Sequence, residues 1–258
     1  MEKLSLAVSL KDLSVSYGDS PALDCVSIDV PSNAFLAVIG PNGGGKTTLL
    51  RCMLGLQKPH TGTVRLWGEE PKKLRHRVGY VPQTRYFDRS FPISVREVVE
   101  MGGLSNLYTR NLSKTEQRQR VDAALQRMQL GALAKRQIGQ LSGGELQRTL
   151  IARALAADAT MLILDEATAS IDPKAIELIY QLLVELNQRI PIITVSHDLG
   201  VVAQYVKTIA CVNRCLHYHD SKELTPQMLE EAYGCPVDLI AHGAPHRVLS
   251  KHTGHAYD

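Results

Sequence analysis

A glycine-rich segment that ends in a lysine and two threonines carries the clearest chemistry in the sequence. Residues 40–48 read Gly40, Pro41, Asn42, Gly43, Gly44, Gly45, Lys46, Thr47 and Thr48, and the first eight fit the pattern G-x-x-x-x-G-K-[ST]. Glycines let consecutive backbone N–H groups turn toward phosphate oxygens, which a Cβ atom would obstruct. Lys46 adds positive charge at the outer phosphates, and Thr47 can ligate Mg²⁺. A simple glycine-rich turn would not require this lysine and threonine directly after an apolar run.

Two acids end another apolar run. Residues 161–164 are Met, Leu, Ile and Leu, and Asp165 and Glu166 follow. Carboxylates at the carboxyl end of a parallel strand lie where open α/β sheets bind ligands. Asp165 is therefore predicted to hold Mg²⁺ through water, and Glu166 to polarise an attacking water as general base. The alternative is a strand that ends in two solvated acids.

Ser142 and Glu145 have the spacing of a capping box before a helix. Gly143 and Gly144 stand between them, although glycine weakens a helix. The pair suggests close approach of a ligand to exposed N–H groups at the helix start, where the dipole favours an anion. This segment follows Lys46 by about 95 residues and need not meet its own phosphate loop.

With these motifs in this order, the chain resembles the ATP-binding subunit of an ABC transporter over nearly its whole length. Residues 40–48 correspond to Walker A, Asp165 and Glu166 end Walker B, and residues 141–145 form the signature. Two departures from the family pattern are Ala167, where proline is usual, and Gly44, where alanine or serine is commoner. The resemblance implies ATP and Mg²⁺ as cofactors.

The resemblance also implies roles for four further residues. Tyr17 stacks on adenine, and Gln83 binds Mg²⁺ and senses the γ-phosphate. Asp172 belongs to the D-loop, and His197 hydrogen-bonds the γ-phosphate and supports the attacking water. Three of them have an alternative without a ligand: Tyr17 as a half-buried strand tyrosine, Gln83 as a solvated loop amide and His197 as a structural histidine.

The family implies a homodimer whose two sites are composite. Lys46 of one copy and Ser142 of the other grip the same γ-phosphate, so ATP shifts the equilibrium toward the closed dimer. An integral membrane permease receives this motion, and an extracytoplasmic metal-binding protein acts indirectly. The implied place of the chain is the cytoplasmic face of the inner membrane, as a peripheral subunit.

The elements that position these residues follow from the apolar pattern. Short strands are predicted within residues 4–30, buried strands at 35–39, 161–164 and 190–195, and helices after residue 46 and at 173–186. Residues from about 90 to 155 are rich in Arg, Gln, Glu and Leu with helical spacing. Alternating strands and helices predict an α/β fold. With the resemblance, this becomes a RecA-like P-loop NTPase parallel-sheet core with an N-terminal antiparallel β subdomain and an inserted helical subdomain.

Composition excludes several other classes. The 258 residues are 44% hydrophobic, which argues against disorder, and the net charge of +3 is too small to argue for nucleic acid, so no nucleic acid partner is expected. No run of 18 apolar residues occurs, and the first residues do not predict a signal peptide. Five irregularly spaced cysteines are a poor disulfide framework and predict the cytosol.

The last part of the chain bears on the transported substrate. We expect an ATP-binding domain over residues 1–225 and a short histidine-containing extension over 226–258. Segments 211–219 and 237–247 resemble those of zinc- and manganese-type importer ATPases, which implies a transition-metal cargo. A regulatory metal site is conceivable, but a solvated or packed tail is the favoured interpretation, because the ligand spacing matches no closed zinc site. The candidate ligands are Cys215, His217, His219, His242 and His246.

Two other functions remain open at this point. An importer ATPase for iron–siderophores or phosphate shares all the core motifs. A soluble ABC ATPase of DNA repair or of ribosomes usually carries two cassettes, a long insertion or a strongly basic face, none of which is visible in the sequence. Intact Lys46, Asp165, Glu166 and His197 argue against a module that only binds partners.

Overall fold

A six-stranded sheet forms the centre of the computed structural model, which describes residues 5–83, 91–104, 112–166, 171–196 and 199–219. The strand order is β5-β6-β7-β3-β8-β9, and only the β8–β9 pair is antiparallel. The strands are β3 (Phe35–Ile39), β5 (Val78–Val81), β6 (Met161–Asp165), β7 (Ile192–Val195), β8 (Thr208–Asn213) and β9 (Cys215–His219). Every residue of β3, β6 and β7 is buried, because helices or a second sheet cover both faces.

A three-stranded antiparallel sheet lies against this core. Its order is β2-β1-β4, formed by β1 (Leu6–Tyr17), β2 (Ser20–Pro31) and β4 (Thr61–Leu66). The apolar faces of these strands share one buried cluster with β3 and with helix α1 (Lys46–Met53). The sequence predicted several short strands here, but β1 and β2 are twelve residues each and are interrupted by register shifts instead.

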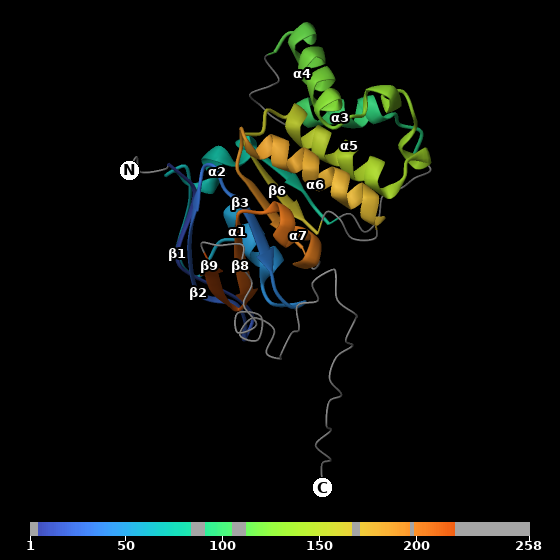
Figure 1. Ribbon diagram of the computed structural model, residues 1–258. Helices are drawn as coiled ribbons and strands as arrows, with labels where there is room; N and C mark the ends of the chain where they lie inside the picture. Colours follow the sequence, from blue (N-terminus) through green and yellow to red (C-terminus); the bar gives the residue numbers. More distant parts are fainter. Residues whose placement is uncertain (1–4, 84–90, 105–111, 167–170, 197–198, 220–258) are drawn as a thin grey trace, which may run out of the picture.

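The four longest helices group at the end of the molecule away from the antiparallel sheet (Figure 1). The segment predicted to be helical contains α3 (Val95–Leu104), α4 (Lys114–Arg127) and α5 (Gly143–Ala156), which share a buried cluster with α6 (Pro173–Asn187) and with β6. Two shorter helices are α2 (Pro71–Leu74) and α7 (Leu199–Tyr205). Single 3₁₀ turns cover Arg75–Arg77, Gly131–Leu133 and Ile138–Gln140.

The structure corrects the prediction for the region after residue 210. The sequence pattern loosens there, yet β8 and β9 form a regular hairpin at one edge of the central sheet. Leu216 and Tyr218 pack toward the core, while Cys215 and His217 alternate with them on the exposed side. Histidine and cysteine mask the period-two pattern, because neither is read as clearly apolar or polar. The predicted domain boundary at 225/226 lies outside the described residues.

The start of β7 and the presence of β4 and β5 also differ from the sequence prediction. Strand β7 begins at Ile192 and not at Ile190, because Pro191 has no N–H to donate to the ladder. Strands β4 and β5 were not predicted. Within the described parts of the chain, no helix is long and apolar enough to cross a bilayer.

Two neighbouring glycines of α3 allow a test of the packing against α5. A Cβ atom on Gly102 would lie 2.0 Å from the backbone oxygen of Arg153, whereas a Cβ on Gly103 would meet nothing within 4 Å. We expect Gly102→Ala to lower the free energy of unfolding by about 1–3 kcal/mol, because backbone must move. Gly103→Ala should be neutral or raise it by about 0.5–1 kcal/mol, because alanine favours helix. Urea titration of both variants checks this, and equal effects would contradict the packing argument.

Candidate active site

The segment that joins β3 to α1 is a loop whose backbone leaves no room for side chains at three of its glycines. A Cβ atom on Gly40 or Gly44 would lie 2.0 or 2.7 Å from the carbonyl oxygen of Val212, and one on Gly45 would lie 2.4 Å from that of Ala22. Gly45 also has a positive φ of 99° as the N-cap of α1. The loop is therefore held between the start of β2 and the end of β8, and its glycines are required by packing.

Lys46 is the first residue of α1, and its ammonium group is buried on this loop. The side chain is 6% exposed, and Nζ donates hydrogen bonds to the carbonyl oxygens of Gly40 at 2.9 Å and Pro41 at 2.8 Å. Burial lowers the pKa of Lys46, whereas Glu166 and Asp165 act in the opposite direction. A fixed cation thus lies within the field of two carboxylates that come from the end of β6.

The loop, the first turn of α1 and three more distant segments surround one cavity of about 470 Å³. Its lining includes nine residues predicted from the sequence and one, Ala22, that was not: Tyr17, Ala22, Asn42, Gly43, Gly45, Lys46, Thr47, Thr48, Gln83 and Glu166. Tyr17 is 49% exposed at the end of β1, so its ring is available at the rim. No sequence signal marks Ala22, because its contribution is the backbone that contacts Gly45.

Asp165 is a buried carboxyl group at the end of β6. The hydroxyl of Tyr80 donates to its Oδ2 at 3.3 Å. Burial raises the pKa of Asp165, against the hydrogen bonds from Tyr80 and Thr47 and the charge of Lys46. Burial also raises the pKa of Tyr80 to about 12. Tyr80 was not predicted as a site residue, since it lies inside the short strand β5.

Glu166 follows with a positive φ of 48°, which turns the chain out of the strand and toward the cavity. The side-chain amide of Gln83 donates to its carboxylate Oε2. The backbone N–H of Glu166 still donates to the carbonyl of Val195 at 3.2 Å, so β7 supports this turn. The structure thus brings together residues from β3–α1, β5 and β6 that are far apart in the sequence.

The residues present fit a hard cation such as Mg²⁺. Mg²⁺ prefers oxygen ligands and keeps several from water and phosphates. Thr47 contributes a hydroxyl, Gln83 an amide oxygen and Asp165 a carboxylate that hydrogen-bonds Thr47. The described residues contain no group of three or more His, Cys, Asp or Glu that could hold a metal by themselves.

The signature residues lie elsewhere, at the start of α5. Ser142 and Glu145 form the predicted capping box, with the Glu145 N–H donating to Ser142 Oγ at 3.2 Å and the Ser142 N–H to Glu145 Oε2 at 2.8 Å. A Cβ on Gly144 would lie 2.5 Å from the Cβ of Ala175, so contact with α6 alone explains this glycine. No residue of 142–145 is among those that line the cavity described above.

The remaining predicted residues do not line this cavity or lie outside the described residues. Asp172 is the N-cap of α6 and accepts a hydrogen bond from the Ala175 N–H at 3.0 Å. His197 and Ala167 lie outside the described residues, as do His242 and His246. Cys215 and His217 are on the exposed side of β9 and do not line the cavity.

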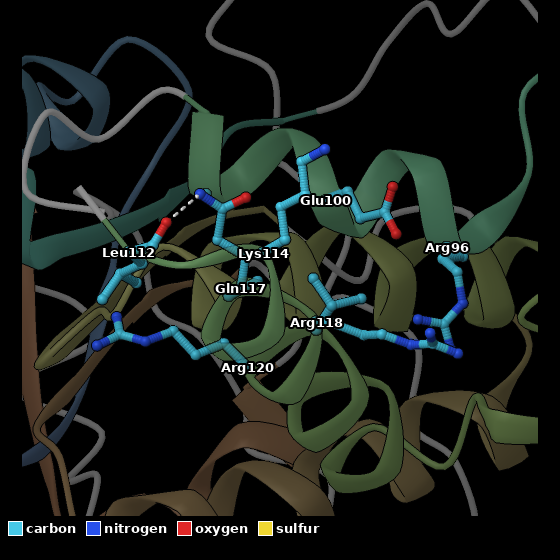
Figure 2. Close-up of a pocket in the computed structure, with 10 residues that line it drawn as sticks. Arg96, Glu100, Leu112, Lys114, Gln117, Arg118 and Arg120 are labelled. Carbon is cyan, nitrogen blue, oxygen red and sulfur yellow. Dashed lines mark hydrogen bonds between the residues drawn. The ribbon is translucent and has the colours of Figure 1, made fainter. Parts of the chain in front are cut away.

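A second cavity, of about 450 Å³, lies between α3 and α4 (Figure 2). Arg96 and Glu100 reach it from α3, and Gln117 spans its wall by donating to the carbonyl of Leu112 at 3.2 Å. Four of its lining side chains are cationic: Arg96, Lys114, Arg118 and Arg120. It has neither a glycine loop nor paired carboxylates, so the chemistry described above belongs to the other cavity.

Comparisons with known proteins agree with this geometry. Residues 23–169 match the family model described as ABC transporter. A probable metal transport system ATP-binding protein of Chlamydia trachomatis is 36% identical over 92% of this chain and 92% of its own length. A manganese transport system ATP-binding protein of Listeria innocua is 36% identical over 91% and 99%, and a zinc transport system ATP-binding protein of Treponema pallidum 36% over 88% and 87%.

Solved structures show the same architecture. The structure of cbiO1 from Clostridium perfringens, part of an ABC transporter complex, has a TM-score of 0.76 at 29% identity and covers 84% of this chain and 89% of its own. The dimeric structure of a bacterial ABC transporter cassette has a TM-score of 0.70 at 28% identity and covers 84% and 100%. The predicted fold, a P-loop core with an antiparallel sheet and inserted helices, is confirmed. The chain belongs to the ABC transporter family and is similar there to the ATP-binding subunits of metal transport systems.

Proposed function

We propose that this chain binds and hydrolyses ATP with Mg²⁺ and so drives a membrane transporter. The observation that carries the proposal is the single cavity that unites the glycine loop, Lys46, Gln83 and Glu166. Backbone N–H groups at the start of α1 and the Lys46 ammonium are a matched surface for a triphosphate. Tyr17 at the rim stacks on the adenine ring.

In this mechanism Glu166 is the general base that takes a proton from the attacking water. Gln83 orients the carboxylate through their hydrogen bond, and His197 supports the water and the γ-phosphate. Lys46, Thr48 and the loop N–H groups of residues 40–45 hold the phosphates in place. Thr47, Gln83 and Asp165 hold Mg²⁺, which neutralises charge on the phosphates when bound.

We infer a composite site built by two copies of the chain. Ser142, Gly143, Gly144, Glu145 and Asp172 are proposed to reach the nucleotide held by the other copy. Their position outside their own cavity supports this, as does the dimer formed by a structurally similar cassette. The N-terminus of α5, with its capping box, would present N–H groups to the γ-phosphate of the partner site.

We propose that the transported substrate is a divalent transition metal, imported by a permease with the help of an extracytoplasmic metal-binding protein. The names of the similar proteins, two of them for manganese and zinc transport, support this. Iron–siderophore or phosphate import is the second candidate. The chain would act at the cytoplasmic face of the membrane, with an ATP-binding domain over 1–225 and an extension over 226–258.

The cavity between α3 and α4 is the proposed contact with the permease. Arg96 and Arg120 already pair with Asp122 at 2.6 Å and Asp158 at 3.1 Å. Lys114 and Arg118 are exposed and have no ion pair within the described chain. Their charge matches an acidic cytoplasmic segment of the permease.

Glu166→Gln should separate ATP binding from turnover. We expect turnover to fall by about 10³-fold, because glutamine cannot take the proton, while ATP and Mg²⁺ hold the chain as a dimer. Light scattering after gel filtration measures the dimer, and Glu185→Gln on the exposed side of α6 is the matched control. A folded Glu166→Gln chain that stays monomeric at saturating ATP and Mg²⁺ would show the composite site to be wrong.

Asp165→Asn tests the cation site through stability as well as activity. In the nucleotide-free chain, burial disfavours the charged carboxylate of Asp165 by more than Lys46 and the hydrogen bonds favour it, so the amide should raise the free energy of unfolding. Turnover should fall by about 10²-fold, because the Mg²⁺ ligand is lost. Asp19→Asn, in the exposed β1–β2 turn, should change neither quantity. Unfolding curves and turnover assays check both, and full activity of Asp165→Asn would remove this residue from the site.

Charge reversal tests the permease contact. The double variant Lys114→Glu, Arg118→Glu should keep the turnover of the purified chain and reduce the fraction retained on membranes of its own cells by about threefold or more. Lys72→Glu with Arg75→Glu, both exposed and away from this cavity, is the matched control. Immunoblots of washed membranes measure retention, and equal retention of both variants would place the contact elsewhere.

A further inference from the structure

Two exposed free cysteines that are far apart in the sequence lie on adjacent segments. Cys25 is in β2 and Cys215 begins β9. The residues just before them are joined by a backbone hydrogen bond, in which the Asp24 N–H donates to the carbonyl of Arg214 at 2.9 Å. Cys25 and Cys215 each directly follow one residue of this hydrogen-bonded pair, so the two cysteines lie on segments in direct contact. A disulfide requires about 4.4–6.8 Å between its Cα atoms.

A β-bulge brings Cys25 to the exposed side of β2. Leu13 pairs with Val26 and Val15 pairs with Leu23, so two residues of β2 stand opposite Ser14 alone. Asp24 and Cys25 are consequently both exposed between buried neighbours, and Cys25 has a positive φ of 48°. The Cys25 N–H donates to Ser14 Oγ at 3.0 Å, which fixes this conformation. Bulges of this kind re-aim a side chain.

The two thiols are also close enough to interact electrostatically. The carboxylate of Asp12 is the main cause that raises the pKa of Cys25, and Cys215 adds to the effect. Cys25 therefore remains a protonated thiol at neutral pH. Because the thiolate is the nucleophilic form, a raised pKa makes Cys25 poorly suited to the first attack on a peroxide.

The segments that carry these thiols are the ones that hold the phosphate loop. The Arg214 N–H, one residue before Cys215, donates to the carbonyl of Gly44 at 2.9 Å. On the other side, the Leu23 side chain would lie 2.7 Å from a Cβ on Gly45. A covalent link between Cys25 and Cys215 would thus tie together the β8–β9 turn and β2, on both sides of the loop.

Metal binding is the less suitable use of this pair. In the residues that the structure describes, no three His, Cys, Asp or Glu come together as a metal site. Two thiols are too few ligands for the tetrahedral coordination of Zn²⁺ but suffice for a disulfide. Disulfides of chains in reducing compartments are usually transient and redox-sensing.

We propose that Cys25 and Cys215 form a reversible intramolecular disulfide that slows the nucleotide site when a peroxide is present. The Cys215 thiolate attacks one peroxide oxygen, the O–O bond breaks, and Cys215 becomes a sulfenic acid as the other oxygen leaves as water or alcohol. Cys25 then loses its proton and attacks that sulfur, the S–S bond forms, and the sulfenic oxygen leaves as water with that proton. The two thiols lose two electrons and the peroxide gains them.

The test uses the full chain with Cys235→Ser, which removes the one cysteine after residue 219. Among the described residues, Cys25 and Cys215 are then the two exposed cysteines. The chain is treated with hydrogen peroxide, and non-reducing peptide mapping locates the disulfide. ATP turnover and the affinity for a fluorescent ATP analogue are measured before treatment, after it and after a phosphine reductant. Cys25→Ser and Cys215→Ser are the comparison variants.

We expect a Cys25–Cys215 link within one chain and a fall in turnover of about tenfold that the reductant reverses, because small displacements of a phosphate loop are costly. Each serine variant should keep its turnover after peroxide. Peroxide-treated chains in which this pair stays unlinked, or is linked with turnover unchanged, would overturn the proposal.

The inference rests on the proposed ATPase function only for its kinetic readout. An untreated chain without turnover would count against that function, whereas the peptide map would still decide on the disulfide.

Discussion

The buried ammonium group of Lys46 constrains how the phosphate loop and the acids at the end of β6 are arranged. A buried charge is tolerated only when hydrogen bonds and opposite charges compensate it. The carbonyl oxygens of Gly40 and Pro41 provide the hydrogen bonds, and Asp165 and Glu166 provide the charge. Those carbonyls come from the loop after β3, and the acids come from the end of β6. The sheet order places only β7 between these two strands, so their carboxyl ends meet at one edge.

The loop around Lys46 depends equally on close backbone packing. Val212 of β8 and Ala22 of β2 approach three glycines at distances that exclude any side chain. Gly44, which departs from the pattern common in the family, is explained by this contact and not by the ligand. The β8–β9 hairpin is therefore part of the support of the phosphate loop. This is why chemistry on the exposed side of that hairpin can reach the nucleotide site.

The start of α5, which carries Ser142 to Glu145, is also explained by packing within one chain. The capping box of α5 is complete within one chain, and Gly144 is needed there for contact with α6. Nothing in these local contacts requires a nucleotide. Its proposed role arises only when a second copy brings this helix start to the cavity of the first. Gly144 is thus needed for packing against α6 and, in the proposed dimer, for contact with the nucleotide.

The sequence by itself determined the local features whose causes are local. The loop glycines, the acids after β6, the capping box and the buried strands at 35–39 and 161–164 were all evident from residue type and spacing. Nine of the residues that line the cavity were named beforehand, Tyr17 and Gln83 among them only through the family resemblance. Only the tertiary structure decided that Tyr80 supports Asp165, that Ala22 and Val212 hold the loop, and that Cys25 lies beside the turn before Cys215. These contacts join β2, β5, β6 and β8, which are far apart in the sequence. The carbonyls of Ala22 and Val212 make their contacts whatever side chains those residues carry. For that reason neither residue type nor spacing along the chain could predict these contacts.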